Sequence, residues 1–453
     1  MTHLSKDRLQ IAVIGTGVSG MAAAWLLNKR HDVEVFEKVN WIGGHCNTVD
    51  VPVNWRMQER SIPVDTGFIV FNEVTYPNLT ALFKHLGVAT EPSDMSFSAS
   101  VENGAFEYSG YNLRSMLAQK RNLLRPRFWN MVWDIIRFFR EASEFDQKAA
   151  EPSLTLGTFL KTNGYSESFI QDYLLPLGRS IWSASYREML AYPLTAFVRF
   201  FKNHGLLEAK ARNRLQWRTV TGGSRSYVQR LTQSFADRIN LNCGVKRIVR
   251  HSDHVELTLE NGQTRRFDHV VLATHSDQAL SILANASALE QQTLGAIRYE
   301  RNTAVLHTDN SLMPKRRRAW ASWNYISDEA ASTSNLVSLT YWMNLLQNID
   351  ERFPIFVTLN PHRPPNEECF IKSFEYEHPI FDHAALNAQK SLWTLQGANR
   401  TWFCGAYFGH GFHEDGLQSG LAVAEALGGV RRPWHVENKS GRIALPAIYS
   451  EAA

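Results

Sequence analysis

The chain is poor in cysteine. Its 453 residues contain four cysteines, at positions 46, 243, 369 and 404, and none belongs to a CxxC pair. Isolated thiols of this kind exclude a disulfide framework and the paired spacing of a zinc site. We therefore expect the reducing environment of the cytoplasm and no bound metal.

The chain also lacks an excess of one charge and any long apolar run. Lysine and arginine number 48 against 44 acidic residues, a net charge of +4. This balance predicts no general attraction to nucleic acid. Uninterrupted apolar windows of membrane-spanning length are missing, and the first apolar run begins at Ile11. The sequence therefore predicts neither a transmembrane helix nor a signal peptide.

What is present near the amino terminus is a glycine motif. Residues 11–20 read Ile-Ala-Val-Ile-Gly-Thr-Gly-Val-Ser-Gly. The apolar residues predict a buried strand, Gly15 a tight turn, Gly17 a close approach of backbone to a pyrophosphate, and Gly20 close packing of the next helix on the sheet. Apolar residues at three- and four-residue spacing predict that this helix is amphipathic.

Glu37 ends the next predicted strand, over residues 33–36. A carboxylate here accepts ribose hydroxyls and repels a 2′-phosphate, which selects NAD or FAD over NADP. Gly43-Gly44 offers a second close backbone approach, as an extended FAD needs. At the far end, residues 401–405 predict a strand, and Asp415-Gly416 opens a helix whose N–H groups would favour charge on the flavin pyrimidine ring. Together these features predict FAD.

Nearly from end to end, the chain resembles bacterial FAD-dependent oxidoreductases of the flavin amine-oxidase-like superfamily. Residues 63–72, 217–224 and 403–416 resemble a branch associated with cyclopropane and methylated or furan fatty-acid synthesis, including a methylated-fatty-acid desaturase. The resemblance implies an α/β fold with a Rossmann-like FAD-binding domain of the glutathione-reductase and amine-oxidase type, assembled from three segments. An α+β substrate domain would accompany it.

The resemblance also implies a division of the chain. Residues 1–72, 217–285 and 397–435 would form the FAD-binding domain, and residues 436–453 a C-terminal tail. Residues 73–216 and 286–396 would form the substrate-binding domain. We expect the first of these two stretches to be largely helical and the second to carry strands.

The motifs and the resemblance together predict the residues that contact FAD. They are Gly15, Gly17, Val18, Ser19, Gly20, Glu37, Lys38, Gly43, Gly44, His45, Gly67, Phe68, Val245, Ala273, Thr274, Gly405, Asp415, Gly416 and Leu417. For Asp415, helix capping and a flavin contact are compatible interpretations. The catalytic candidates are His413, as a proton carrier or a structural histidine, and Tyr407.

The predicted reaction is hydride transfer from a C–H bond of a methylated or cyclopropane fatty-acyl substrate to flavin N5, which desaturates the chain. Amine oxidases of the superfamily carry a lysine on the strand that matches residues 302–306, and none stands here. His45 also replaces the arginine that commonly follows the glycine doublet. Three alternatives stay open: a flavin-dependent amine oxidase, a redox-neutral fatty-acid double-bond isomerase, and a flavin-binding partner protein without turnover.

Residues 121–140 are a candidate for a basic, aromatic helix. Its apolar stripe consists of Phe128, Val132, Ile135 and Phe139, widened by Trp129, Trp133 and Ile136. The stripe fits either an inward face in the substrate domain or peripheral contact with the inner membrane, which would admit an acyl chain. The expected partners are a fatty-acyl or phospholipid substrate and a lipid methyltransferase or cyclopropane synthase.

Overall fold

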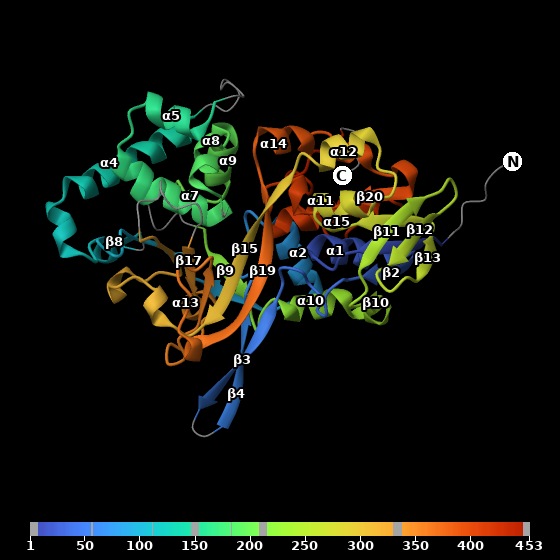
Figure 1. Cartoon of the computed structure of the whole chain (residues 1–453), viewed down its shortest axis with the longest axis horizontal. Coiled ribbons are helices and arrows are strands. Elements are labelled where there is room, and N and C mark those ends of the chain that lie inside the picture. Colours follow the sequence, from blue (N-terminus) through green and yellow to red (C-terminus); the bar gives the residue numbers. More distant parts are fainter. Residues whose placement is uncertain are drawn as a thin grey trace.

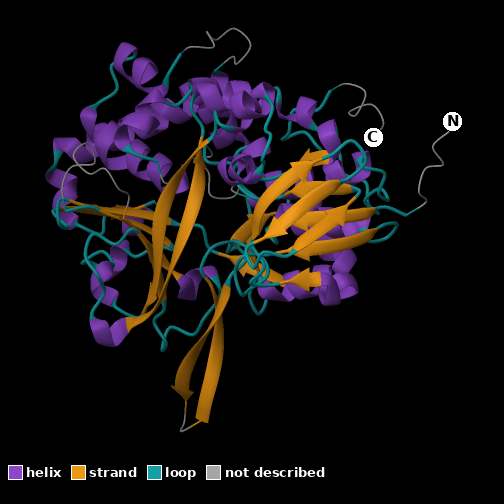
Figure 2. Cartoon of the chain, turned by 45° about the vertical axis from the view of Figure 1, so that its right-hand side comes forward, coloured by secondary structure: helices purple, strands orange, loops and turns teal. Residues whose placement is uncertain are grey.

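Two sheets organise the molecule. The computed structural model describes residues 8–55, 58–110, 112–145, 154–182, 184–207, 215–328 and 338–446. A five-stranded parallel sheet lies in one half and a seven-stranded sheet in the other (Figure 1). Helices crowd one side of the larger sheet, and a two-stranded hairpin projects from the opposite side (Figure 2).

The parallel sheet draws its strands from three separated stretches of the chain. In spatial order they are β10 (Ile239–Asn240), β2 (Asp32–Phe36), β1 (Gln10–Ile14), β14 (His269–Leu272) and β20 (Thr401–Phe403). The apolar residues of β1 are buried on both faces, as a central parallel strand requires. The predicted fold class, including assembly from three segments, is confirmed.

Helix α1 (Val18–Leu27) differs from the sequence prediction, because it is buried on every side rather than amphipathic. It packs against α15 (His413–Ala426), which covers the face that would otherwise meet solvent. A Cβ added at Gly420 would lie 2.1 Å from the carbonyl oxygen of Ser19, so the two helix backbones touch at a glycine. The amphipathic prediction was wrong because this partner comes from the other end of the chain.

The larger sheet belongs to the substrate half. Its order is β19 (Phe370–Ile380), β15 (Arg298–His307), β18 (Phe356–Leu359), β17 (Ser338–Trp342), β16 (Trp323–Ile326), β7 (Phe97–Val101) and β8 (Phe106–Ser109). The strands expected in residues 286–396 are therefore present. Two of its strands come from the first substrate stretch, where the described residues are mostly helical.

Helices of that stretch lie over one side of the sheet (Figure 2). They are α3 (Leu113–Met116), η1 (Lys120–Leu124), α4 (Pro126–Glu144), α5 (Leu156–Thr162), α6 (Glu167–Phe169), η2 (Ile170–Leu174), α7 (Leu175–Trp182), α8 (Tyr186–Ala191) and α9 (Leu194–Asn203). Their aromatic side chains form a core of their own, which includes Phe138, Phe169, Phe197 and Phe201.

Smaller sheets join the two halves. The hairpin β3 (Thr48–Trp55) and β4 (Gln58–Asp65) projects from the body, and β5 (Val70–Asn72), β9 (Trp217–Val220) and β6 (Thr90–Ser93) form a three-stranded sheet. Asp65 accepts hydrogen bonds from the backbone N–H of Ser224 (2.9 Å) and from Gln347 Nε2 (3.1 Å). One buried carboxylate thus connects the nucleotide half to the substrate half.

Most of the other helices and strands lie around the parallel sheet. They are α2 (Pro77–Leu86), α10 (Arg225–Thr232), β11 (Val245–Arg250), β12 (Val255–Leu259), β13 (Thr264–Phe267), α11 (Ser276–Ile282), α12 (Ala288–Leu294) and α14 (His383–Gln389). Helix α13 (Met343–Leu346) contacts β17 and β18 of the larger sheet instead. Residues 436–446 of the expected tail are described, and Arg442 from this tail pairs with Asp415. Among the described residues, no helix has the length and apolar content needed to cross a bilayer.

Candidate active site

The glycine motif forms a cradle at the end of β1. Gly15 has a φ of +102°, and an added Cβ would lie 2.8 Å from the carbonyl oxygen of Ala273. At Gly17 no described atom lies within 4 Å of an added Cβ. The backbone at the start of α1 therefore faces open space, which is the close approach that a pyrophosphate requires.

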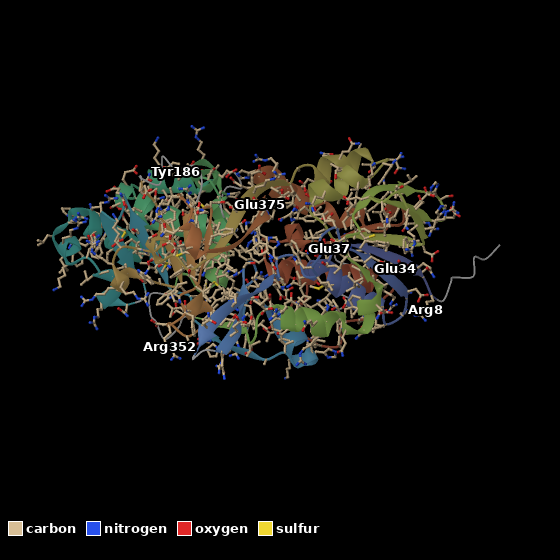
Figure 3. All side chains as sticks on the ribbon, turned by 60° about the horizontal axis from the view of Figure 1, so that its bottom comes forward. Arg8, Glu34, Glu37, Tyr186, Arg352 and Glu375 are labelled. Carbon is tan, nitrogen blue, oxygen red and sulfur yellow. The ribbon has the colours of Figure 1, made fainter. Side chains whose placement is uncertain are left out.

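Glu37 stands beside this cradle with its carboxylate already oriented. Oε2 accepts hydrogen bonds from the backbone N–H and the hydroxyl of Thr16, at 3.0 and 2.6 Å. Oε1 accepts the backbone N–H of Val39 at 3.2 Å. Figure 3 shows Glu37 inside the molecule, whereas Arg8 lies at its edge. This arrangement fits the ribose of an adenine dinucleotide.

The glycine doublet Gly43-Gly44 lies against the first glycine motif. Gly43 and Gly44 both have positive φ, and a Cβ added at Gly44 would lie 3.2 Å from the Cα of Gly17. The backbone N–H of Gly43 donates to the hydroxyl of Thr16 at 3.2 Å. Two glycine turns that are distant in the sequence therefore form one phosphate-binding cradle, and it fits FAD.

Most of the predicted FAD contacts line a single large cavity of about 960 Å³. The lining includes Gly15, Gly17, Val18, Ser19, Glu37, Lys38, Gly43, Gly44, His45, Gly67, Phe68, Val245, Ala273, Thr274 and Gly405, together with both catalytic candidates, Tyr407 and His413. Residues from the amino-terminal, central and carboxy-terminal parts of the chain thus meet at one place.

Four predicted contacts lie outside that lining: Gly20, Asp415, Gly416 and Leu417. Gly20 packs instead, since its added Cβ would lie 2.1 Å from the carbonyl oxygen of Gly15. Asp415 is buried and accepts the backbone N–H of Phe412 at 2.8 Å, which caps α15. For Asp415 the structure shows the capping role, and any flavin contact of these residues stays a prediction.

His413 is held by a buried network. Its Nε2 lies 2.5 Å from the Tyr227 hydroxyl and 3.3 Å from Cys46 Sγ, and its ring stacks on Phe68 at a centroid distance of 3.9 Å. Burial lowers the pKa of His413 to about 3. The imidazole is therefore neutral at physiological pH and fixed in place. Its role as a proton carrier stays a prediction.

Sequence reasoning missed two histidines beside the predicted His45. His275 and His378 line the cavity with it, and the rings of His45 and His378 are 5.4 Å apart. His275 Nδ1 lies 3.2 Å from a carboxylate oxygen of Glu377. Burial lowers the pKa of His378 to about 4, and burial and the neighbouring histidines hold the pKa of His45 well below its usual value. Single histidines scattered along the chain carry no motif that could have revealed the cluster.

Asn302 begins the stretch of β15, residues 302–306, that matches the lysine-bearing strand of the amine oxidases and has no lysine. Its Nδ2 donates to the carbonyl oxygen of Glu300 and lies 3.2 Å from His378 Nδ1, while its Oδ1 accepts from Asn360 at 2.8 Å. Because Nδ1 of His378 accepts here, the ring carries its proton on Nε2. The neutral ring of His378, with its N–H at Nε2, thus lines the cavity beside this stretch without lysine.

Beyond the nucleotide cradle the same cavity continues into the substrate half. Its lining there is mainly apolar and aromatic: Met95, Phe97, Tyr108, Met116, Phe139, Tyr173, Leu177, Ile181, Trp182, Phe200, Leu215, Trp323, Tyr341 and Leu359. Among the described lining residues, Lys38 is the only lysine or arginine. Trp182 Nε1, Trp323 Nε1 and the Tyr407 hydroxyl are buried without a partner in the described structure. Buried donors normally have a hydrogen-bond partner, so these three can donate to a bound ligand.

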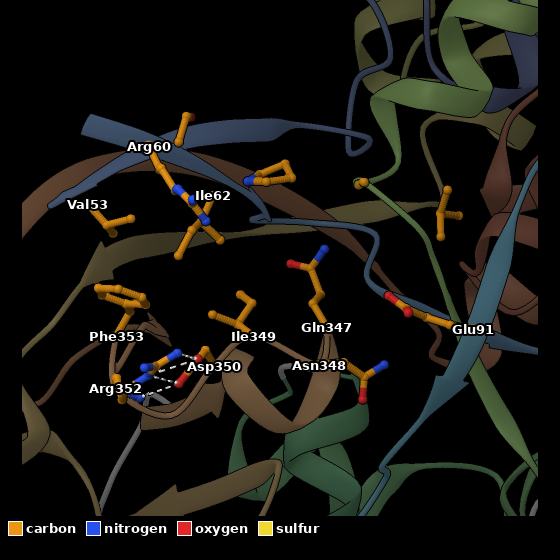
Figure 4. A pocket seen from close by; sticks show the side chains of 15 residues that line it. Val53, Arg60, Ile62, Glu91, Gln347, Asn348, Ile349, Asp350, Arg352 and Phe353 are labelled. Atoms are coloured by element: carbon orange, nitrogen blue, oxygen red, sulfur yellow. Dashed lines mark hydrogen bonds and ion pairs between the residues drawn. The ribbon is translucent and has the colours of Figure 1, made fainter. Parts of the chain in front are cut away.

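A second pocket of about 400 Å³ lies away from the cradle (Figure 4). The β3–β4 hairpin and the loop after α13 enclose it, with Arg60 and Ile62 facing Ile349 and Phe353. Arg352 pairs with Asp350 at its rim. None of the predicted cofactor residues lines this pocket. We therefore place the active site in the larger cavity.

The chain matches a known family of flavoproteins over most of its length. Residues 18–351 match the model of the flavin containing amine oxidoreductases. The chain belongs to this family. It is thus an oxidoreductase with FAD as its cofactor, and the cradle described above fits that cofactor.

Relatives within the family are distant. AofH of Mycobacterium tuberculosis, whose name assigns it to the flavin-containing monoamine oxidases, is 26% identical over 264 residues. The aligned part covers 56% of this chain and about half of that protein, 54% of its length.

Solved structures show the same fold at low identity. The CLA-producing fatty acid isomerase from P. acnes (15% identity, TM-score 0.61) matches 93% of this chain and 98% of its own. Cyclohexylamine oxidase from Brevibacterium oxydans IH-35A (16%, TM-score 0.65) matches 93% and 99%. Putrescine oxidase bound to putrescine (13%, TM-score 0.62) also matches 93% and 99%. At these identities the likeness concerns the fold alone.

Proposed function

We propose that this enzyme dehydrogenates the acyl chain of a lipid, with methylated or cyclopropane fatty-acyl groups as its substrates. The observation that carries the proposal is the long apolar cavity that continues from the flavin cradle. Apolar and aromatic side chains line its substrate half, and the only lysine or arginine of the described lining, Lys38, adjoins Glu37 in the nucleotide half. A hydrocarbon chain gains most from such walls.

The reaction would remove one hydride and one proton from neighbouring carbons and leave a double bond, with the Glu377 carboxylate of the cavity lining as the base that takes the proton. Bound FAD would supply the chemistry of a hydride acceptor at N5. The walls would exclude water and hold the chain, and the polar side chains of the lining include Tyr407 and the neutral His378. The electron pair must then pass to an external acceptor, dioxygen or a quinone, which restores the oxidised cofactor.

The proposal is tested by expressing the chain in a heterologous bacterium and profiling its fatty acids, with Glu37→Ala as the variant that binds FAD more weakly. We expect new unsaturated acyl species with the wild type and fewer of them with the variant. Purified enzyme should also lose its flavin absorbance under anaerobic conditions when such lipids are added. Ile181→Trp, which fills the cavity, should keep FAD and lose this bleaching. Bleaching that survives in Ile181→Trp would contradict the proposal.

Amine oxidation is the second candidate. The family match favours it, and so does Glu377, a cavity carboxylate able to pair with an ammonium group. Glu377 is already paired with His275, however, and residues 302–306 contain no lysine. Peroxide release with primary or secondary amines, without reduction by any acyl substrate, would favour this candidate.

Two other outcomes are distinguished by the products. An isomerase would return the hydride and leave the number of double bonds unchanged; the P. acnes enzyme that shares this fold is named as a fatty acid isomerase. A flavin-binding partner of a lipid methyltransferase or cyclopropane synthase would bind FAD and show no substrate-driven reduction.

A further inference from the structure

Helix α4 has apolar side chains on two opposite faces. Phe128, Met131 and Phe138 are buried toward the protein. On the other side Trp129, Trp133 and Ile136 are 50%, 71% and 60% exposed, and they follow one another at the spacing of a single helix face. The stripe read from the sequence is therefore divided: the residues that we expected to widen the inward face point to solvent.

The exposed stripe extends into the preceding helix. In η1, Leu123 and Leu124 are also exposed, the latter by 88%. Of the ten large apolar side chains exposed among the described residues, five lie within residues 123–136. Such a concentration on one element marks a contact surface rather than scattered surface residues.

Basic side chains border this stripe, and they come from two distant parts of the chain. Arg121 and Arg125 both donate to the carbonyl oxygen of Ala105, at 2.6 and 2.8 Å. Arg316 reaches the neighbouring carbonyl of Gly104 at 3.4 Å. Segments 120–127 and 315–318 thus meet around one turn, between β7 and β8.

Part of this positive charge has no acidic partner. Arg127 and Arg316 pair with the buried carboxylates of Asp172 and Glu107. Within the described structure, by contrast, Lys120, Arg140 and Arg318 are exposed and make no ion pair. Burial, together with the nearby Arg121 and Arg127, lowers the pKa of the Arg125 guanidinium.

The exposed stripe lies directly over the substrate cavity. Phe139, one turn further along α4, lines that cavity together with Tyr108 of β8 and Met116 of α3. Helix α4 therefore presents apolar side chains to solvent on one side and contributes Phe139 to the cavity wall on the other. The described lining here offers no cation for a free carboxylate, whereas the basic residues stand outside.

We propose that the α4 surface, consisting of η1, the outward face of α4 and residues 315–318, docks on an anionic lipid bilayer, and that the substrate is the acyl chain of a membrane lipid. The first part stands on the surface alone, and the second rests on the proposed function. Trp129 and Trp133 would lie at the headgroup level, where indole rings accumulate. Lys120, Arg140 and Arg318 would face anionic headgroups.

The test uses the full-length, FAD-loaded protein and vesicles of phosphatidylcholine with or without phosphatidylglycerol. We expect co-flotation with the anionic vesicles and a blue shift of tryptophan emission. The triple variant Lys120→Gln, Arg140→Gln, Arg318→Gln should bind about a hundredfold more weakly, at about fivefold for each basic residue. Trp129→Ser with Trp133→Ser should lose both binding and the blue shift.

Matched controls remove the same groups elsewhere. Lys246→Gln, Lys390→Gln and Arg431→Gln delete three exposed charges, and Leu289→Ser with Phe370→Ser deletes two exposed apolar side chains. These controls should bind vesicles as the wild type does. Melting temperature and bound-FAD absorbance should be unchanged in every variant, so that a loss of binding is not a loss of folding.

Several results would overturn the proposal. The first is that the protein does not float with anionic vesicles, and the second is that the control variants lose vesicle binding as much as the test variants do. The third is that the wild type is a dimer which the tryptophan variants dissociate, because a second copy of the chain would then cover the α4 surface. The two proposals also fail separately. Vesicle binding without acyl turnover removes the proposed function and leaves the docking surface. Turnover of dispersed fatty acids without vesicle binding removes the docking surface alone.

Discussion

The nucleotide cradle and the substrate cavity are continuous in space but built in opposite ways. Backbone makes the cradle, in glycine turns that are each contiguous in the sequence, such as residues 15–20 and 43–44. Side chains make the cavity, and they come from helices and strands hundreds of residues apart. A site that uses backbone needs a specific local sequence, whereas a site that uses side chains needs only apolar volume. This difference explains why the cofactor can be read from the sequence and the substrate cannot.

The largest expected effect on stability distinguishes Gly20, which packs against the backbone of Gly15, from Gly17, which faces the open cradle. Gly20→Ala places a methyl group 2.1 Å from the carbonyl oxygen of Gly15, and we expect destabilisation of about 3 kcal/mol or more. Gly17→Ala meets no described atom within 4 Å, so the apoprotein should keep its melting temperature while FAD binding weakens. Thermal unfolding with and without added FAD checks both variants. Equal melting temperatures of the two apoproteins would contradict the assignment.

The next effect concerns the carboxylate of the cradle. Glu37→Ala removes the acceptor of three hydrogen bonds from Thr16 and Val39. These bonds orient the carboxylate toward the expected ribose position, where a charge-assisted hydrogen bond would contribute about 2 kcal/mol, so the dissociation constant of FAD should rise roughly tenfold to a hundredfold. FAD titration of the apoprotein measures it. Glu34→Ala is the matched control, because Glu34 lies on the same strand and pairs with Arg265 instead; a similar loss there would refute a specific role for Glu37.

A smaller, pH-dependent effect should appear where the two halves meet. Burial raises the pKa of Asp65 from 3.8 to about 6. In this interval the folded protein keeps a proton that the unfolded chain has lost, so the free energy of unfolding falls as the pH rises from about 4 to about 6, by at most about 1.4 kcal/mol per pH unit. Chemical denaturation across this range should show the slope in the wild type. Asp65→Asn should flatten it, and an identical slope in the variant would show that another group is responsible.

The smallest effect on stability should come from the cavity itself. The Tyr407 hydroxyl is buried and has no partner in the described structure. Tyr407→Phe should therefore change the free energy of unfolding by no more than about 1 kcal/mol, in either direction. It should still shift the flavin absorbance if the hydroxyl faces the cofactor. A large destabilisation would mean that Tyr407 supports the fold and not the site.

Particular elements show where sequence reasoning succeeded. The strand predicted over residues 33–36 lies within β2, and the strand predicted over residues 401–405 begins with β20. Their signals are local, because each is a short apolar run. The cofactor motifs succeeded for the same reason, because each turn carries its own glycines.

Other elements failed because their environment is set from afar. Helix α1 is buried all round, since α15 arrives from four hundred residues away. His275 and His378 come together with His45 only when β19 folds back over the cradle, and no motif announces them. Trp129 and Trp133 look like part of a core stripe until α4 is seen to bury its other face.

The sequence by itself determined that this protein holds FAD in a Rossmann-like cradle, because positive φ, absent side chains and a carboxylate at a strand end are properties of short contiguous stretches. Only the tertiary structure decided which side chains wall the large cavity, which histidines line it together and which face of α4 meets solvent. Those features depend on contacts between residues far apart in the chain. Periodicity along one element cannot specify the partner that covers it.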